Sequence, residues 1–184
     1  MPEIYEPQED SYLMSDFLKK EIPKLLKINP ELKLLEVGVG SGINLVTTRT
    51  AGVKKENILG TDVNFNAVEH CRGLGFNCIT SDLFDKIPEQ KFNLIIFNPP
   101  YLPLDKKEPK TSRIATTGGK KGNEIMIKFL KQAENYINSD GKIFIITSSL
   151  SQGVNFDEFG YNFKEVTSTS LFFEKLSLWE LELK

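Results

Sequence analysis

Four consecutive residues, Asn98-Pro99-Pro100-Tyr101, have the chemistry to hold a planar amino group. A proline restricts the residue before it to an extended backbone, and two successive prolines fix φ and remove two amide donors. The segment therefore offers carbonyl acceptors without competing donors. Asn98 adds a side-chain carbonyl and Tyr101 adds an aromatic face. If the Asn98 side chain and the Pro99 carbonyl accept the two hydrogens of an NH2 group, its lone pair is directed at a methyl donor.

Such a nitrogen, in an amide or a nucleobase, is a weak nucleophile because its lone pair is delocalised. The same two dipoles would stabilise the positive charge that develops on the nitrogen during attack. Proximity and orientation could lower the barrier by about 7–11 kcal/mol. A structural turn would explain an isolated Asn-Pro or Pro-Pro pair. The position of this segment directly after an apolar strand, downstream of a cofactor signature, favours catalysis.

That signature begins with a glycine-rich turn, Gly38-Val39-Gly40-Ser41-Gly42, which follows the apolar residues 34–37 and includes Glu36 just before it. Glycines there allow the backbone to approach a ligand closely, and the amides at the start of the next helix are donors. A single Gly-x-Gly-x-Gly pattern is weak evidence. We expect Gly38, Gly40 and Gly42 to contact a cofactor only because two acidic residues follow at the right places.

Asp62 ends the next predicted strand, about twenty residues on, where a carboxylate can accept from both ribose hydroxyls. Asp82, within Ser81-Asp82-Leu83-Phe84, follows the third strand and could accept from the adenine amino group. Either acid alone could be a turn or helix cap. Together they mark the carboxyl ends of consecutive strands, where open α/β sheets bind ligands. An adenosine-containing cofactor is predicted. A dinucleotide enzyme is the weaker alternative, because the loop lacks Gly-x-Gly-x-x-Gly and nothing else supplies a hydride-transfer site.

The order of apolar segments predicts a doubly wound α/β domain. Short β-branched runs alternate with longer amphipathic stretches, and several runs are continuously apolar, as buried parallel strands should be. The predicted strands are Lys33–Val37, Ile58–Asp62, Phe76–Thr80, Leu94–Phe97, Lys142–Thr147, Phe163–Thr167 and Leu176–Leu183. The predicted helices are Asp10–Leu26, Ile43–Thr50, Asn66–Leu74 and Glu124–Ile137, with Asp140-Gly141 ending the connection after the last. This order indicates a seven-stranded, mostly parallel sheet with one antiparallel strand.

Length and composition limit the classes of protein. The chain has 184 residues, of which 40% are hydrophobic, enough for one domain with a full core. No apolar run approaches the roughly 18 residues of a membrane span, and Met1-Pro2-Glu3 does not start a signal pattern, so we expect a cytoplasmic protein. One histidine excludes a multi-histidine metal site, and no metal is expected. Cys71 and Cys78 are expected to be free thiols.

The motifs together resemble the HemK-type protein-glutamine methyltransferases, and more narrowly their archaeal and eukaryotic branch. The pattern comprises Tyr5-Glu6-Pro7-Gln8-Glu9-Asp10-Ser11, the Glu36–Gly42 loop, Asp62, Ser81–Phe84 and Asn98–Tyr101, and it extends through residues 118–124 to the last strand. The N-terminal segment is its more discriminating part, because Asn-Pro-Pro-Tyr also occurs in nucleic-acid methyltransferases. The resemblance implies one class I, Rossmann-like methyltransferase domain over residues 1–184, with residues 1–30 as an N-terminal helical segment.

The resemblance also implies S-adenosylmethionine as the methyl donor. The acceptor would be the glutamine in the Gly-Gly-Gln loop of the class I peptide release factor. Carried over position by position, the donor contacts are Ser11, Glu36, Gly38, Asp62, Asp82, Leu83 and Asn98, and the acceptor contacts are Asn98 through Tyr101. Bacterial members carry a helical recognition domain before the catalytic one, whereas only about thirty residues precede the first strand here. In the branch resembled, a small zinc-binding activator forms a heterodimer with the enzyme.

A partner is also suggested by the third strand, which lies at one edge of a class I methyltransferase sheet. Edge strands are normally protected by charges, prolines or bulges. Residues 73–81, which include the predicted strand Phe76–Thr80, carry no charge and no proline. We therefore expect the activator to add a strand here and to cover Phe76 or Ile79.

Two other functions compete with protein methylation. A DNA or RNA adenine or guanine amino-methyltransferase could use the same Asn-Pro-Pro-Tyr segment, and residues 102–122 have a local basic excess that would suit RNA. The net charge of −2 and the lack of a target-recognition domain argue against it, so direct nucleic-acid binding is not expected. The other reading is a scaffold that stabilises a partner, which would need neither Asn98 nor a complete cofactor set.

Overall fold

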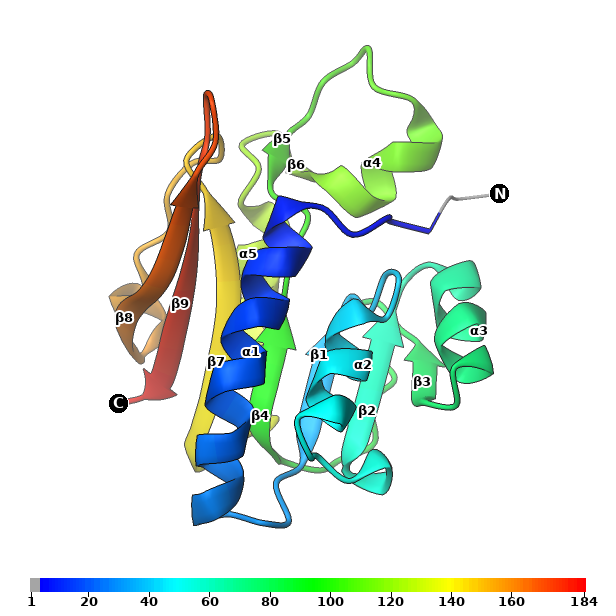
Figure 1. Cartoon of the computed structure of the whole chain (residues 1–184). Helices are drawn as coiled ribbons and strands as arrows, with labels where there is room; N and C mark the ends of the chain where they lie inside the picture. Colours follow the sequence, from blue (N-terminus) through cyan, green and yellow to red (C-terminus); the bar gives the residue numbers. More distant parts are fainter. Residues whose placement is uncertain (1–3) are drawn as a thin grey trace.

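The computed structural model describes residues 4–184, which form a seven-stranded sheet in the order β3-β2-β1-β4-β7-β9-β8 (Figure 1). Its strands are β1 Leu34–Val37, β2 Ile58–Asp62, β3 Asn77–Thr80, β4 Phe92–Phe97, β7 Ile137–Ser148, β8 Tyr161–Ser170 and β9 Lys175–Leu183. Only β9 runs antiparallel to its neighbours, β7 and β8. The predicted fold class is confirmed.

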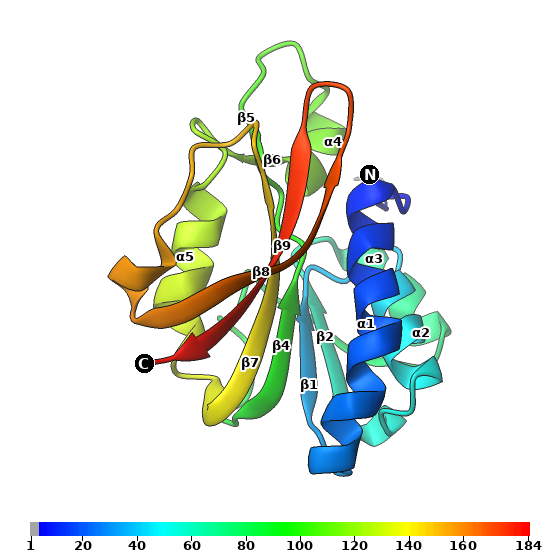
Figure 2. The same ribbon diagram turned by 60° about the vertical axis from the view of Figure 1, so that its left-hand side comes forward.

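Helices cover both faces of the sheet (Figure 2). They are α1 Glu9–Ile28, α2 Ile43–Thr50, α3 Phe65–Gly73, α4 Lys110–Thr116 and α5 Glu124–Ala133, with short 3-10 turns at Lys55–Asn57 and Phe156–Phe159. α1, α2 and α3 lie on one face and α5 lies on the other. Each face has its own apolar core; Met14, Leu18 and Ile22 of α1 are 0% exposed in the first, and Phe129 of α5 is 0% exposed in the second. No helix in residues 4–184 has the length and hydropathy to cross a bilayer.

The sheet changes direction at its centre. From β1 the chain builds outward through β2 to β3, and it then returns to place β4 on the other side of β1. Such a reversal opens a crevice at the carboxyl ends of the two central strands, because the following loops lead to opposite faces. The glycine loop follows β1 and Asn98 follows β4. The two motifs therefore meet at this reversal.

Two predictions of secondary structure are wrong. The helix predicted over Glu124–Ile137 ends at Ala133, because Ile137 already pairs with Phe92 of β4, and Asp140-Gly141 therefore lies inside β7. The region after Asn-Pro-Pro-Tyr, where no element was predicted, contains β5 Leu102–Pro103, α4 and β6 Thr117–Gly119, with β5 and β6 paired in a small second sheet. These short elements were not predicted because the polar composition of the segment shows little periodicity.

The two cysteines are buried free thiols, as predicted. Cys78 of β3 lies against β2, where Gly60 leaves the room for it. A Cβ atom added at Gly60 would lie 2.6 Å from Val39 Cγ1 and 2.8 Å from Cys78 Sγ. Both contacts are shorter than packed atoms tolerate, so glycine at this position is required by the core.

We therefore expect Gly60→Ala to lower the free energy of unfolding by about 1–3 kcal/mol through overpacking. Gly73→Ala is the matched control, because no described atom lies within 4 Å of its added Cβ. Its effect should stay within about 0.5 kcal/mol. Urea denaturation followed by circular dichroism measures both. Equal unfolding midpoints for the two variants would contradict this account of the core.

Candidate active site

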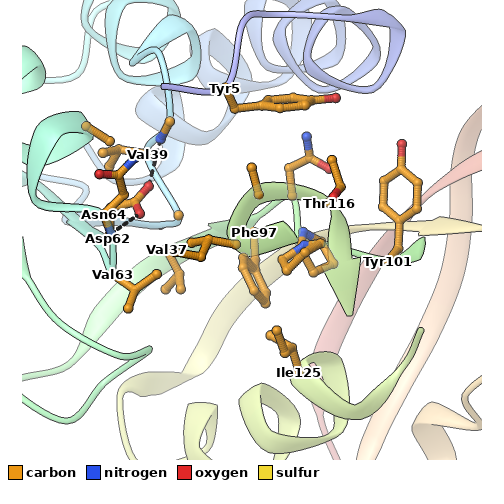
Figure 3. A pocket seen from close by; sticks show the side chains of 18 of the residues that line it. Tyr5, Val37, Val39, Asp62, Val63, Asn64, Phe97, Tyr101, Thr116 and Ile125 are labelled. Carbon is orange, nitrogen blue, oxygen red and sulfur yellow. Dashed lines mark hydrogen bonds between the residues drawn. The ribbon is translucent and has the colours of Figure 1, made fainter. Parts of the chain in front are cut away.

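A cavity of about 480 Å³ opens at the carboxyl ends of the central strands. Figure 3 shows Asp62 on one side of it and Tyr101 on the other, with Tyr5 above and Phe97 and Ile125 below. The volume lies in the range of small-molecule sites. The structure brings together nearly all the predicted site residues, since the cavity is lined by Ser11, Glu36, Gly38, Gly40, Asp62, Asp82, Leu83, Asn98, Pro99, Pro100 and Tyr101.

Gly42 is the predicted site residue that lies outside the cavity lining. It caps the start of α2 with φ 78°, in the left-handed region that favours glycine. A Cβ atom at this position would lie 2.9 Å from Cys71 Sγ. Gly42 thus serves the turn and the packing of α2 against α3, whereas Gly38 and Gly40 face the cavity.

Asp62 holds the glycine loop in place. Its Oδ2 accepts a hydrogen bond from the Gly40 amide at 3.0 Å, and its Oδ1 accepts one from the Asn64 amide at 2.8 Å. Burial raises the pKa of this carboxyl, and the amide donors oppose that shift. The carboxylate is therefore fixed in orientation and keeps further acceptor capacity toward the cavity.

Glu36 is a buried acid at the centre of the site. It is 2% exposed, and its Oε1 accepts from Asn44 Nδ2 at 3.1 Å. Within residues 4–184 its Oε2 has no hydrogen-bond partner. Burial raises the pKa of Glu36 well above its usual range, because hydrogen bonding by the Asn44 side chain and the Leu45 backbone offsets only part of the desolvation. This side chain is suited to a ligand that brings a donor or a positive charge.

The third-strand motif is more open. The Asp82 carboxylate forms an ion pair with Lys128 Nζ at 2.6 Å, and the Asp82 side chain is 58% exposed. Leu83 has φ 48°, a left-handed conformation that no other described non-glycine residue adopts. Such backbones cost of order 1–3 kcal/mol and occur mostly at functional sites. The turn directs the backbone at Leu83 to the cavity, while Lys128 holds Asp82 at its rim.

The Asn98 side chain carries an unused acceptor. Its Oδ1 is buried, and the described part of the chain supplies it with no donor. β4 positions it, since that strand is hydrogen-bonded to β1 on one side and β7 on the other. Pro99 and Pro100 have no amide hydrogens, so this segment brings two fewer backbone donors to the cavity. A ligand NH2 group has the complementary chemistry.

One cluster in the site was not foreseen. Asp10 is 4% exposed, and its Oδ2 accepts from the hydroxyls of Tyr5 at 3.1 Å and of Tyr101 at 3.3 Å. Burial and the Asp10 carboxylate raise the pKa of both phenols, so both remain donors. Ser11 is bound to the same carboxylate through its amide at 2.6 Å. The N-terminal segment was recognised as a motif, but the pairing of Asp10 with Tyr101 depends on contacts across 91 residues of sequence.

Comparisons with known proteins agree with this geometry. Residues 14–170 match the family described as methyltransferase small domain. A protein of Methanocaldococcus jannaschii, named as a candidate protein N5-glutamine methyltransferase, is 35% identical over 158 residues, covering 82% of this chain and 75% of the relative. The mouse methyltransferase HEMK2 is 27% identical over 156 residues, with 79% and 72% covered.

The chain belongs to the HemK-type methyltransferase family. It is therefore a methyltransferase. Among solved structures, a chain of the E. cuniculi Mtq2–Trm112 complex superposes with a TM-score of 0.69 at 24% identity, over 98% of each chain. The 16S rRNA methyltransferase RsmC of T. thermophilus gives 0.61 at 14% identity, over 96% of this chain and 44% of that one. Both share the fold.

The Glu36 carboxyl is suited to bind a ligand, but its burial is predicted to lower the free energy of unfolding near neutral pH. Its raised pKa means that the native state keeps a proton that the unfolded chain has already released. As pH rises from about 4.5 through the folded pKa, wild-type stability should therefore fall. Glu36→Gln removes this loss and should raise the free energy of unfolding by about 1–3 kcal/mol near neutral pH, with a smaller gain below pH 4.5.

Urea titrations at several pH values measure this effect, and Glu89→Gln, at an exposed position outside the cavity, serves as the control. The free energy of unfolding of Glu36→Gln should exceed that of wild type by an amount that grows with pH. A difference independent of pH would contradict the assignment of Glu36 as a buried acid with a raised pKa.

Proposed function

We propose that this enzyme transfers the methyl group of S-adenosylmethionine to the side-chain amide nitrogen of a glutamine. The acceptor we propose is the glutamine of the Gly-Gly-Gln loop in the class I peptide release factor. The observation that carries the proposal is the Oδ1 of Asn98, which is buried without a hydrogen-bond partner in residues 4–184, beside two prolines that also line the cavity. The names of the relatives support the same substrate class: protein N5-glutamine methyltransferase in M. jannaschii, and eRF1 methyltransferase catalytic subunit in Schizosaccharomyces pombe.

The residues of the cavity fit the proposed methyl donor. S-adenosylmethionine offers an adenine amino group, two ribose hydroxyls and an ammonium group as donors. The cavity supplies acceptors in Asp82, Asp62 and Glu36, of which Glu36 Oε2 is buried without a partner in residues 4–184. Gly38 and Gly40, with φ 71° and 48°, let the backbone approach such a ligand. When bound, the group supplies an electrophilic methyl on a positively charged sulfur.

The chain's own residues would do the rest of the chemistry by orientation. Asn98 Oδ1 and the Pro99 carbonyl accept the two hydrogens of the glutamine NH2, so its lone pair is exposed and its developing positive charge is stabilised. A proton leaves this nitrogen only after attack, so a strong base is not required beforehand. Tyr101, held by Asp10, forms the far wall and restricts the plane of the amide.

A protein acceptor is favoured over a nucleic acid. The net charge is −2, and the cavity wall is acidic, with Asp10 and Glu174 among its residues. Both features oppose a phosphate backbone. We also propose that residues 1–184 form one catalytic domain that includes the N-terminal segment 1–30, because Asp10 and Ser11 of that segment line the cavity.

The test of the proposed function is methyl transfer from labelled S-adenosylmethionine. Asn98→Ala should lower kcat on the release factor by about two orders of magnitude or more, as the loss of one preorganised dipole does in other enzymes. Donor affinity should fall less. Asn162→Ala, at an exposed position on β8, should behave as wild type.

Replacing the acceptor glutamine of the factor should remove the label. Near wild-type turnover by Asn98→Ala would contradict the proposed mechanism. Preferential labelling of bulk RNA or DNA would contradict the proposed substrate.

We further propose that a small zinc-binding activator pairs with the edge strand β3. The fold neighbour from E. cuniculi was solved as a complex of Mtq2 with Trm112. β3 ends the sheet on its side. The Ser81 amide donates to the Asp62 carbonyl at 2.9 Å, so Thr80, one residue earlier, directs its backbone groups away from β2. The Thr80 amide thus points to the open side of β3, where an added strand can accept from it.

The edge differs in two ways from the sequence-based expectation. Arg72 Nε of α3 donates to the Cys78 carbonyl at 3.0 Å and covers one edge acceptor. Phe76 is 4% exposed, packed under Arg49 with the guanidinium carbon 4.8 Å from the ring centroid. Of the two side chains that a partner was expected to cover, Phe76 or Ile79, Phe76 is already buried by the chain itself. Ile79 remains half-buried and accessible.

Substitutions on β3 test this interface. Thr80→Pro should remove the outward amide and abolish copurification with the activator, and Ile79→Lys should reduce it several-fold. Thr167→Pro on β8, at the opposite side of the sheet, is the control. Coexpression followed by size-exclusion chromatography measures the yield of complex. Wild-type yield for both β3 variants would place the interface elsewhere.

A further inference from the structure

The tip of the β8–β9 hairpin carries two phenylalanines in contact with solvent. Phe172 is 100% exposed and Phe173 is 91% exposed, with ring centroids 6.3 Å apart. They lie in the middle of a tight connection closed by the Leu171 amide, which donates to the Glu174 carbonyl at 2.7 Å. Glycine, asparagine and aspartate are the residues that such turns favour. Neither turn chemistry nor core packing explains two aromatic side chains here.

The tip is fixed next to the cavity. Glu174 lines the cavity, and its carboxylate accepts from Ser148 Oγ at 2.5 Å. The Ser149 amide donates to the Lys175 carbonyl at 2.9 Å, which ties the base of the tip to the end of β7. Figures 1 and 2 both show the tip projecting beyond the same end of the sheet as the segment that contains β5, α4 and β6. Phe172 and Phe173 themselves lie outside the cavity lining, but the next residue, Glu174, belongs to it.

That neighbouring segment, residues 102–122, presents positive charge. Four exposed lysines, Lys106, Lys107, Lys120 and Lys121, form no ion pair within residues 4–184. Asp105 and Glu108 carry the only opposite charges in residues 102–122, where Lys and Arg outnumber them. Neither acid forms an ion pair with the four lysines in the described part of the chain; Glu108 accepts from Ser112 and Thr117, and Asp105 accepts from a backbone amide. The segment therefore keeps a positive excess. Unpaired cations attract an acidic partner and speed its association.

We propose that Phe172, Phe173 and these four lysines form a docking surface for the protein that carries the methylated glutamine. The partner would present an acidic surface beside an apolar recess that takes the two rings. This inference rests on the proposed function. Exposed aromatic side chains that become buried in a complex contribute a large share of binding energy, whereas flanking charges steer the encounter. The surface is continuous with the cavity that the glutamine must enter.

Aromatic rings and lysines can also bind single-stranded nucleic acid. The charges next to the rings favour a protein instead. Glu174 directly follows Phe173, and Asp10 lies in the cavity wall behind it. A strand stacked on Phe172 and Phe173 would bring its phosphates close to these carboxylates.

The double variant Phe172→Ser/Phe173→Ser tests the proposal, in complex with the activator if the two copurify. The probe is the release factor with its acceptor glutamine replaced by alanine, so that binding is measured without turnover. Calorimetry should show that the dissociation constant for this factor rises by about 10- to 100-fold. Affinity for S-adenosylmethionine should be unchanged. Replacing the four lysines by glutamate should slow association and reduce its dependence on salt.

Ile28→Ser is the control for the phenylalanine variant, and Lys20→Glu/Lys27→Glu is the control for the lysine variant. All three residues are exposed on α1, and Ile28, which is 84% exposed, lies at the end of this helix that is remote from the cavity. Wild-type affinity of the phenylalanine variant for the factor would overturn the proposal, as would an equal loss of affinity for S-adenosylmethionine. So would loss of binding to a single-stranded RNA with the factor still bound. Failure of the wild-type enzyme to methylate the factor would instead reject the proposed function.

Discussion

The register of β1 against β4 is the constraint on which the active site depends. Val37 pairs with Phe97, so Gly38 and Asn98 leave the sheet at the same level and on adjacent strands. The room between them is small, since a Cβ atom on Gly38 would lie 3.5 Å from the Phe97 ring and 4.0 Å from the Asn98 carbonyl. A slip of one residue would turn the buried side chains of β1 to the wrong face. The pairing of β1 with β4 thus brings the glycine loop and the Asn-Pro-Pro-Tyr segment to the same end of the sheet.

Around this point the protein keeps polar groups where solvent cannot reach them. Glu36 Oε2 and Asn98 Oδ1 are buried without hydrogen-bond partners in the described chain, and Leu83 has a left-handed backbone. Each costs stability, by roughly 1–3 kcal/mol for an unsatisfied polar group. Two packed apolar layers compensate, with residues such as Phe144 and Phe129 fully buried on opposite faces of the sheet. The site is thus ready for a ligand that brings donors.

The N-terminal segment closes the site from above. Asp10 joins Tyr5, which precedes α1, to Tyr101, which follows the two prolines. Because one carboxylate accepts from both phenols, the wall of the acceptor site and the cover of the cavity share an anchor. This arrangement explains why the segment at residues 5–11 is as characteristic of the chain as the glycine loop. Its residues belong to the site although they lie far from it in sequence.

Much of this could be predicted from the sequence. The period of apolar residues predicted the fold class, and the glycines after β1, the acid that ends β2 and the acid after β3 predicted much of the cavity lining, because these features depend on local backbone preference. Asn98-Pro99-Pro100-Tyr101 carried its chemistry in four adjacent residues. By contrast, α4 and the end of α5 were missed, since a polar segment shows little periodicity and Ile137 leaves the helical pattern only because Phe92 is its neighbour in the sheet.

The tertiary structure alone decided which of these residues meet. In the folded chain Gly42 packs between α2 and α3 and not in the cavity lining, Phe76 is buried beneath Arg49, and Asp10 accepts a hydrogen bond from Tyr101. The tertiary structure also placed the tip of the β8–β9 hairpin, with Phe172 and Phe173, beyond the same end of the sheet as β5, α4 and β6. All four outcomes depend on contacts between segments distant in the chain. Local sequence determines what a residue can do chemically, whereas strand order and packing determine what lies within reach of it.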